Sequence, residues 1–215
     1  MYDNSAARQA AAIRAHARRA GWRWLLARLG VTVHTRRADA QAGAWAAGGK
    51  GEADTGALLS VLEREGWRVL HDRAIPGART ANADHVLVSP GARVFVVDSK
   101  LWSARGGAVV RPVGGRLMHG DRVDERAIRS VRFEADLVSR ALGVVVQPLI
   151  AVHNAPVAGQ GFILEDVPVV SAERLVELLR GNDGPRQAGA VHLAQLAVDR
   201  LPPYIGREQG PGRRR

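Results

Sequence analysis

The chain has 215 residues, of which 46% are hydrophobic and 24% charged, so it can bury a core of ordinary domain size. It contains no cysteine, which excludes a disulfide scaffold, thiolate catalysis and cysteine-ligated zinc. The net charge of +10 favours a polyanionic partner, although an arginine-rich surface without a binding role would give the same sum. No apolar run is long enough to cross a bilayer and no signal-like segment is present, so we expect a soluble, cytoplasmic protein.

The N-terminal part is basic and has a helical pattern. Residues 5–29 are rich in Ala, Leu and Arg and lack proline, which predicts one or two helices. Trp22, Trp24 and Leu25 belong to an apolar stripe that is surrounded by arginines. Such a helix could pack on the core, lie along phosphates or touch an anionic membrane, and packing is the simplest of these roles.

The rest of the chain alternates between helix and strand patterns. A helix is expected to open at Gly48–Glu52 and to stop at Gly66, where Glu52 could simply complement the helix dipole. We expect a basic helical extension at 1–46, a core domain at 47–181, and a C-terminal helix with a disordered basic tail at 182–215. The later elements are predicted as strands 67–70, 85–88, 93–100, 144–152 and 167–170, a hairpin at 108–118, and helices 124–142, 171–181 and 187–200.

One strand ends in charged residues that need an explanation. Val94 to Val97 are four consecutive apolar residues, and Asp98 and Lys100 follow them. Residues two apart in a strand share a face, so this carboxylate and this ammonium project together from the end of a core strand. Buried charge is costly unless it has a partner or a metal. Only two of the 31 basic residues are lysines, at positions 50 and 100, so Lys100 is not a generic cation.

A second carboxylate is predicted to lie beside the first. If Ser89 pairs with Arg93 across a three-residue loop, paired positions sum to 182, and Asp84 falls opposite Asp98. Two carboxylates this close are unfavourable unless a proton or a cation lies between them. A hard divalent ion with oxygen ligands is the economical solution.

Three short motifs carry a resemblance to a known family: Gly48-x-x-Gly51-Glu52, Asn82-x-Asp84 with its following strand, and Val96-Val97-Asp98-Ser99-Lys100-x-Trp102. In this order they resemble the nuclease-related domain (NERD) family, a branch of the PD-(D/E)xK nucleases. The resemblance implies an α/β fold with a mixed central sheet flanked by helices. It also implies Mg²⁺ or Mn²⁺ held by Asp84 and Asp98, with Glu52 completing the site and Lys100 acting on the attacking water. Asp98 stands where Glu is commoner in the family, and the later helix lacks the Gln that related nucleases often carry.

From these residues we expect a metal-dependent nuclease that cleaves DNA, with RNA as a possible substrate. The backbone carbonyl of Ser99 is a further candidate metal ligand. Arg122, Arg126 and Arg129 recur at helical spacing and, with Lys50, are the candidate phosphate contacts, although a solvated helix face would look the same. A nucleic-acid-binding module without turnover is the alternative function. Basic termini that bind a membrane or a protein are a third, weaker possibility, and a homodimer remains open; we expect no membrane partner for the core.

Overall fold

A six-stranded sheet organises the part of the chain that the structure, a computed structural model, describes: residues 49–78 and 82–205. The strand order is β1-β2-β3-β7-β9-β8, and the first three strands are antiparallel while β3, β7 and β9 are parallel. The predicted mixed sheet is therefore confirmed, whereas the expected N-terminal helices and basic tail lie outside the described residues. The strands are β1 Arg68–Ala74, β2 Asn82–Val88, β3 Val94–Leu101, β7 Val146–His153, β8 Gly161–Leu164 and β9 Val167–Ser171.

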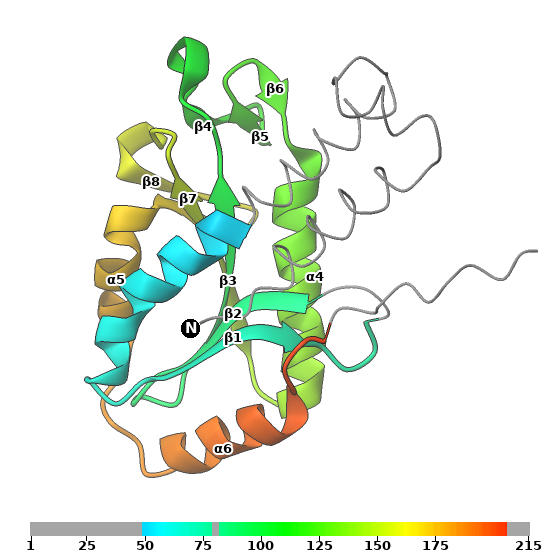
Figure 1. Ribbon diagram of the computed structural model, residues 1–215, viewed down its shortest axis with the longest axis vertical. Helices are drawn as coiled ribbons and strands as arrows, with labels where there is room; N and C mark the ends of the chain where they lie inside the picture. The colour runs from blue at the N-terminus through cyan, green and yellow to red at the C-terminus, as the bar shows by residue number, and fades with distance from the viewer. Residues whose placement is uncertain (1–48, 79–81, 206–215) are drawn as a thin grey trace, which may run out of the picture. The chain divides into compact units, whose positions relative to one another are not determined.

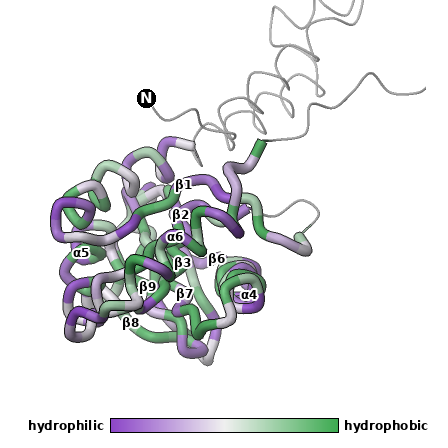
Figure 2. Tube along the Cα trace, turned by 90° about the horizontal axis from the view of Figure 1, so that it is seen from below, coloured by the Kyte–Doolittle hydropathy of each residue, from purple (hydrophilic) through white to green (hydrophobic). Residues whose placement is uncertain are grey.

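Helices cover both faces of this sheet (Figure 1). One face packs against α4, Glu125–Leu142, and α6, Ala190–Arg200, while the other packs against the helix of residues 49–63 and α5, Ala172–Gly181. The central strands are mostly hydrophobic in Figure 2, as expected for strands buried on both faces. Lys50–Pro203 forms one compact unit that includes α6. None of the described helices is long and apolar enough to cross a membrane.

The turn between β2 and β3 sets the register on which the site depends. Val88 pairs with Val94 and Val86 with Val96, so the predicted pairing sum of 182 is confirmed. Ser89 closes the turn, because its N–H donates to the Arg93 carbonyl over 2.9 Å. Gly91 is required in this turn, since an added Cβ would lie 2.3 Å from Asp183 Oδ1.

The predicted crossover between parallel strands is also present, with α4 connecting β3 to β7. Asp124 caps α4 by accepting hydrogen bonds from the backbone N–H groups of Arg126 and Ala127, and Gly143 ends it in the left-handed conformation. This cap starts the helix at Glu125, so the expectation that Arg122 continues the helical spacing is wrong. Arg122 lies instead in β6, Arg122–Val123.

A small second sheet lies between β3 and α4 in the sequence. It consists of β4, Val110–Val113, β5, Arg116–His119, and β6. The predicted hairpin is confirmed, and its turn is Gly114-Gly115 with φ values of 54° and 74°, which suit glycine. In Figure 1 this sheet lies beyond the carboxyl end of β3, next to the start of α4.

Candidate active site

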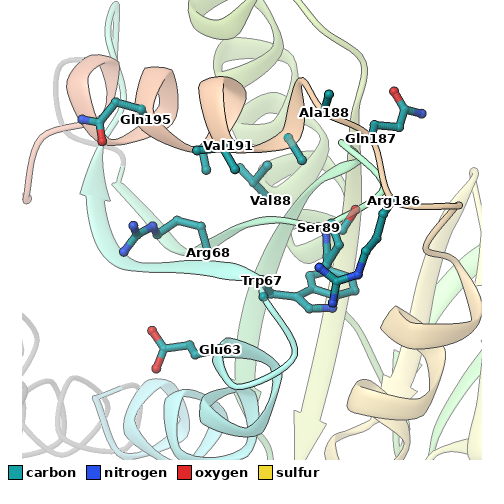
Figure 3. A pocket seen from close by; sticks show the side chains of 14 residues that line it. Glu63, Trp67, Arg68, Val88, Ser89, Arg186, Gln187, Ala188, Val191 and Gln195 are labelled. Atoms are coloured by element: carbon teal, nitrogen blue, oxygen red, sulfur yellow. The ribbon is translucent and has the colours of Figure 1, made fainter.

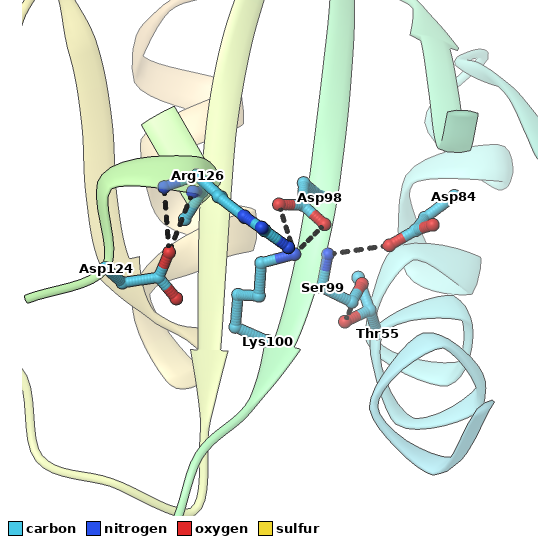
Figure 4. A network of polar contacts seen from close by, with 8 residues as sticks. Thr55, Asp84, Asp98, Ser99, Lys100, Asp124 and Arg126 are labelled. Atoms are coloured by element: carbon cyan, nitrogen blue, oxygen red, sulfur yellow. Dashed lines mark hydrogen bonds and ion pairs between the residues drawn. The ribbon is translucent and has the colours of Figure 1, made fainter. Parts of the chain in front are cut away.

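The three residues singled out by the sequence come together on one face of the large sheet. Alternation along the strands places Asp84, Asp98 and Lys100 on the same face as Val86 and Val96, which belong to the core under α4. Asp98 is 6% exposed, so its carboxylate is buried at the end of the strand. The arrangement brings two acids and one ammonium from adjacent strands to a single place (Figure 4).

The Asp84 side chain contacts β3 just beyond the last backbone pair of the β2–β3 ladder. The last paired residues are His85 and Val97, one position short of the two acids. Beyond that point the Ser99 N–H donates to Asp84 Oδ2 over 2.9 Å. A side-chain carboxylate thus satisfies a backbone donor that the ladder leaves unpaired, and this bond fixes the Asp84 side chain beside β3.

Lys100 is held by Asp98. Its Nζ donates to Asp98 Oδ1 over 2.8 Å and lies 2.7 Å from Oδ2 as an ion pair. The geometry at Oδ2 is not that of a hydrogen bond, and this buried oxygen has no hydrogen-bond partner among the described residues. One acceptor of the Asp98 carboxylate is therefore available for a better-placed cation.

The carboxyl groups of the site outnumber its one ammonium, and their charged forms are disfavoured while no cation is bound. Burial raises the pKa of Asp84 well above its usual value, and the charges of Asp98 and Glu52 add to this effect. Glu52, from the first turn of the helix of residues 49–63, therefore acts electrostatically on the site, as its motif suggested. Burial lowers the pKa of Lys100, but the charges of Asp98 and Asp84 outweigh it and the net pKa is raised. The ammonium stays charged, as the surrounding acids predict.

A further carboxylate, Glu134 of α4, was not anticipated. Burial and the charge of Asp98 raise the pKa of Glu134 to about 8, and its charge also acts on Lys100. The sequence did hold a signal, because Glu134 lies three residues after Val131 and four before Val138, both buried on the inner face of α4. An acid inside an apolar helical stripe marks a site or a buried pair.

The opposite face of β3 carries a neutral network. The Ser99 hydroxyl donates to Thr55 Oγ1 over 2.9 Å, and Thr55 Oγ1 is 2.7 Å from His153 Nε2. Beside it, the Nδ1 atoms of His71 and His85 are 2.7 Å apart, in hydrogen-bond contact. Burial lowers the pKa of His85 to about 3, so this imidazole is neutral. Hydroxyl and imidazole groups here meet one another, with no surplus of charge.

The candidate phosphate contacts surround the site without forming one cluster. Figure 4 shows the Arg126 side chain directed from the first turn of α4 toward the Asp98–Lys100 pair. Arg129 folds back on its own helix, where its Nε donates to the Glu125 carbonyl over 2.9 Å. Lys50 forms an ion pair with Asp54 on the exposed side of its helix. Arg126 is therefore directed at the site, whereas Arg129 and Lys50 make contacts on their own helices.

The donor set suits a hard divalent cation. Within residues 49–78 and 82–205 no three His, Asp or Glu side chains converge on one point, so a cage made of side chains alone is absent from this part of the chain. Mg²⁺ does not need one, because it is usually bound by one or two carboxylates and completes its octahedron with water and substrate oxygens. Asp84 and Asp98, whose Oδ2 accepts no hydrogen bond from the described residues, fit this requirement.

A cavity lies at the other end of β3. It has a volume of about 590 Å³ and is lined by residues that include Trp67, Ser89, Arg186 and Val191 (Figure 3). Ser89 precedes β3, whereas Lys100 is near its end, and six residues of strand separate Val94 from Lys100 by about 20 Å. The cavity is thus separate from the carboxylates.

Comparison with known proteins agrees with this geometry. A family model described as the nuclease-related domain matches residues 47–155, just over half of the 215 residues. The chain belongs to the nuclease-related domain family. The matched region contains Glu52, Asp84, Asp98, Lys100 and Glu134, so the charged site lies wholly within the nuclease-related domain. No curated protein and no solved structure matches the chain significantly.

Proposed function

We propose that this nuclease-related domain hydrolyses phosphodiester bonds in DNA with the help of a divalent cation. The observation that carries the proposal is the meeting of Asp84, Asp98 and Lys100 on one buried face. Paired carboxylates with surplus negative charge favour a cation, and a lysine beside them supplies the positive group that phosphoryl transfer needs. Family membership supports a nuclease-related role for the same residues.

Asp84 and Asp98 would hold Mg²⁺ or Mn²⁺, with Glu52 and the Ser99 carbonyl as additional oxygen ligands. When bound, the ion would neutralise charge on the scissile phosphate and make water a better nucleophile. Ser99 N–H keeps Asp84 oriented, so the carboxylate does not have to be ordered when the ion arrives. The Lys100 ammonium, now 2.7 Å from Asp98 Oδ2, would share this carboxylate with the ion and would supply positive charge for the phosphate.

Lys100 serves in this proposal as a charged group. A general base needs a pKa near the working pH, and the carboxylates around Lys100 raise its pKa instead. The ammonium would therefore orient water and stabilise negative charge on the phosphoryl oxygens. Arg126, Arg122, Arg129 and Lys50 would bind the flanking phosphates, and the Arg126 side chain is directed toward the Asp98–Lys100 pair in Figure 4.

One observation favours a second function, a nucleic-acid-binding module without turnover. Lys100 lies 2.8 Å and 2.7 Å from the two Asp98 oxygens, so an internal cation already neutralises the central acid. If Asp98 binds the Lys100 ammonium more strongly than it binds Mg²⁺, the domain would bind nucleic acid and leave it intact. The two functions differ in one observable, which is metal-dependent strand cleavage.

The test is nicking of supercoiled plasmid by the full chain in Mg²⁺ or Mn²⁺, beside an EDTA control. We expect Lys100→Ala and Asp98→Asn each to lower the rate by about 10²–10³-fold, the range for losing one group that stabilises charge in the transition state. Lys50→Ala is the comparison at the other lysine, which is exposed and paired with Asp54; loss of a flanking phosphate contact should weaken DNA binding, but the cleavage rate at saturating DNA should fall far less.

Circular dichroism of each variant separates lost chemistry from lost folding. Asp98→Asn keeps the shape of the side chain, so it remains informative if Lys100→Ala fails to fold. Wild-type nicking that survives EDTA, or a folded Asp98→Asn variant with the wild-type rate, would rule out the proposed mechanism. Retarded but uncut plasmid would support the binding module.

A further inference from the structure

The segment of residues 103–120, here called the arm, follows β3 directly and carries positive charge that has no role in the proposed active site. It contains Arg105, Arg111 and Arg116 and no Asp or Glu. Arg105 and Arg116 are exposed and Arg111 is partly exposed. Within the described part of the chain, the ion pairs involve none of these three arginines.

The arm is fixed relative to Lys100. Trp102, two residues after Lys100, stacks on His119 of β5 with ring centroids 5.2 Å apart and planes 13° from parallel. His119 Nε2 is in turn 2.8 Å from the Ser103 carbonyl oxygen. The Val110 N–H donates to the Pro156 carbonyl over 2.8 Å, which ties β4 to the segment after β7. The arginines are thus carried on a supported hairpin.

One face of the hairpin is buried and the other is open. Val110 and Leu117 are 0% and 2% exposed and belong to the core under α4. Alternation places Arg111, Val113 and Arg116 on the opposite face, where Val113 is 50% exposed. The open face therefore presents two guanidinium groups beside an apolar side chain, at the end of β3 that carries the proposed active site (Figure 1).

We propose that this arm binds the backbone of the DNA on one side of the cleaved bond, with Arg105, Arg111 and Arg116 each contacting a phosphate. This inference rests on the proposed function, in which DNA is the substrate. Three cations without a carboxylate complement a polyanion, whereas a peptide partner would need an acidic segment of its own. Four residues of strand extend about 13 Å, which corresponds to about four base pairs of duplex at 3.4 Å each. The contacts are with phosphates, so the arm adds affinity without sequence preference.

The experiment measures the affinity of the full chain for a fluorescent 20-base-pair DNA duplex by anisotropy, in EDTA and across a series of salt concentrations. The arm variant is R105Q/R111Q/R116Q. The charge-matched control is R64Q/R68Q/R140Q, whose arginines are exposed and lie toward the other end of β3. Circular dichroism and thermal melting check that both variants fold.

The salt dependence gives a quantitative expectation. Each phosphate contact contributes about 0.9 to the slope of log K against log salt, so the arm variant should lose about 2.7 from the wild-type slope. The control should keep the wild-type slope, since its arginines are distant from the DNA. Equal slopes for the arm variant and the control would overturn the inference.

Failure of the arm and failure of the proposed nuclease are distinguishable, because binding is measured in EDTA and cleavage is not required. If the wild-type protein fails to nick plasmid but the arm variant still shows the reduced salt slope, the arm binds DNA and the proposed nuclease activity is wrong. If the wild-type protein nicks plasmid and the arm variant binds and cuts DNA at the wild-type level, only the inference about the arm is wrong.

Discussion

The two faces of β3 bury polar groups in opposite ways. On the Ser99 face, hydroxyl and imidazole groups of Thr55 and His153 satisfy one another over 2.9 Å and 2.7 Å. On the Asp98 face, one ammonium lies among several carboxylates, and burial together with the charge of Asp98 raises the pKa of Asp84 and of Glu134. A neutral, satisfied network stabilises a fold, whereas a buried surplus of one charge costs stability unless a ligand compensates it. The neutral face therefore supports the fold by itself, whereas the carboxylate face is the one that a cation would stabilise.

The largest effect should follow from neutralising one acid on the charged face. Asp84→Asn keeps an oxygen to accept the Ser99 N–H but removes an ionisable group whose raised pKa costs stability at neutral pH. We expect cleavage to fall more than about 100-fold, beyond the loss typical of groups that only support a metal ligand. The metal-free protein should nevertheless melt higher, by about 2–4 °C for each 1 kcal/mol gained.

The effect of Mg²⁺ on the melting temperature provides a second test of the role of Asp84. Mg²⁺ should raise the melting temperature of the wild-type protein, because an ion that binds only the folded state stabilises it by mass action. Asp84→Asn should lose that increase. An Asp84→Asn protein that is less stable than wild type without metal, yet stabilised by Mg²⁺, would contradict the assignment of Asp84 to the charged site.

The second prediction concerns Glu134 and pH. Its pKa is raised by burial to about 8 in the folded protein, against an ordinary value of 4.5. The folded state therefore holds this proton more tightly, so its stabilising contribution is complete below pH 4.5 and is lost as the pH rises through about 8. Glu134→Gln avoids that loss. The variant should exceed wild type in urea midpoint at pH 8.5, and the difference should shrink as the pH approaches 4.5.

Glu134 also shows what sequence alone could not supply. Asp84, Asp98 and Lys100 were predictable because strand alternation and a three-residue turn are local rules, and both held. The position of Glu134 depends instead on how α4 crosses back over β3, a long-range arrangement that no local pattern specifies. The apolar stripe of α4 placed Glu134 at its inner face but could not say which strand it would meet.

Other parts of the fold were missed for local reasons. The strand β8, which pairs with β9, was not predicted, because its turn is Glu165-Asp166, with φ values of 48° and 62°. Hairpin turns of this conformation are usually signalled by Gly or Asn, and neither is present. The helix expected at 171–181 is present as α5, but Ser171 only precedes it, and the Ser171 side chain makes no capping hydrogen bond. Strand β1 continues to Ala74, beyond the expected end at residue 70.

The third prediction tests the neutral face with acid. Burial lowers the pKa of His85 to about 3 and also lowers that of His71, from an ordinary value of 6.5. Their contribution to stability is therefore complete above pH 6.5 and is lost as the pH falls toward 3. In the D84N/E134Q double variant the opposing carboxylates are removed, so the urea midpoint should decline steadily between pH 7 and pH 4.5. A midpoint that rises over this range would show that the imidazoles accept protons without cost.

The smallest effect on catalysis should come from the neutral network itself. Thr55 is 0% exposed, and Thr55→Val is nearly isosteric. The substitution nevertheless leaves the Ser99 hydroxyl and His153 Nε2 without their hydrogen-bond partner. Each buried group left unsatisfied costs about 1–3 kcal/mol, so the variant should melt measurably lower. Cleavage per folded molecule should stay near the wild-type rate, because the Ser99 N–H to Asp84 bond lies on the backbone and survives. From the two faces of one strand, Thr55→Val would then lower stability and keep activity, whereas Asp84→Asn would raise stability and lose activity. If Thr55→Val abolished nicking in a folded protein, the hydroxyl chain would have to be counted as part of the active site.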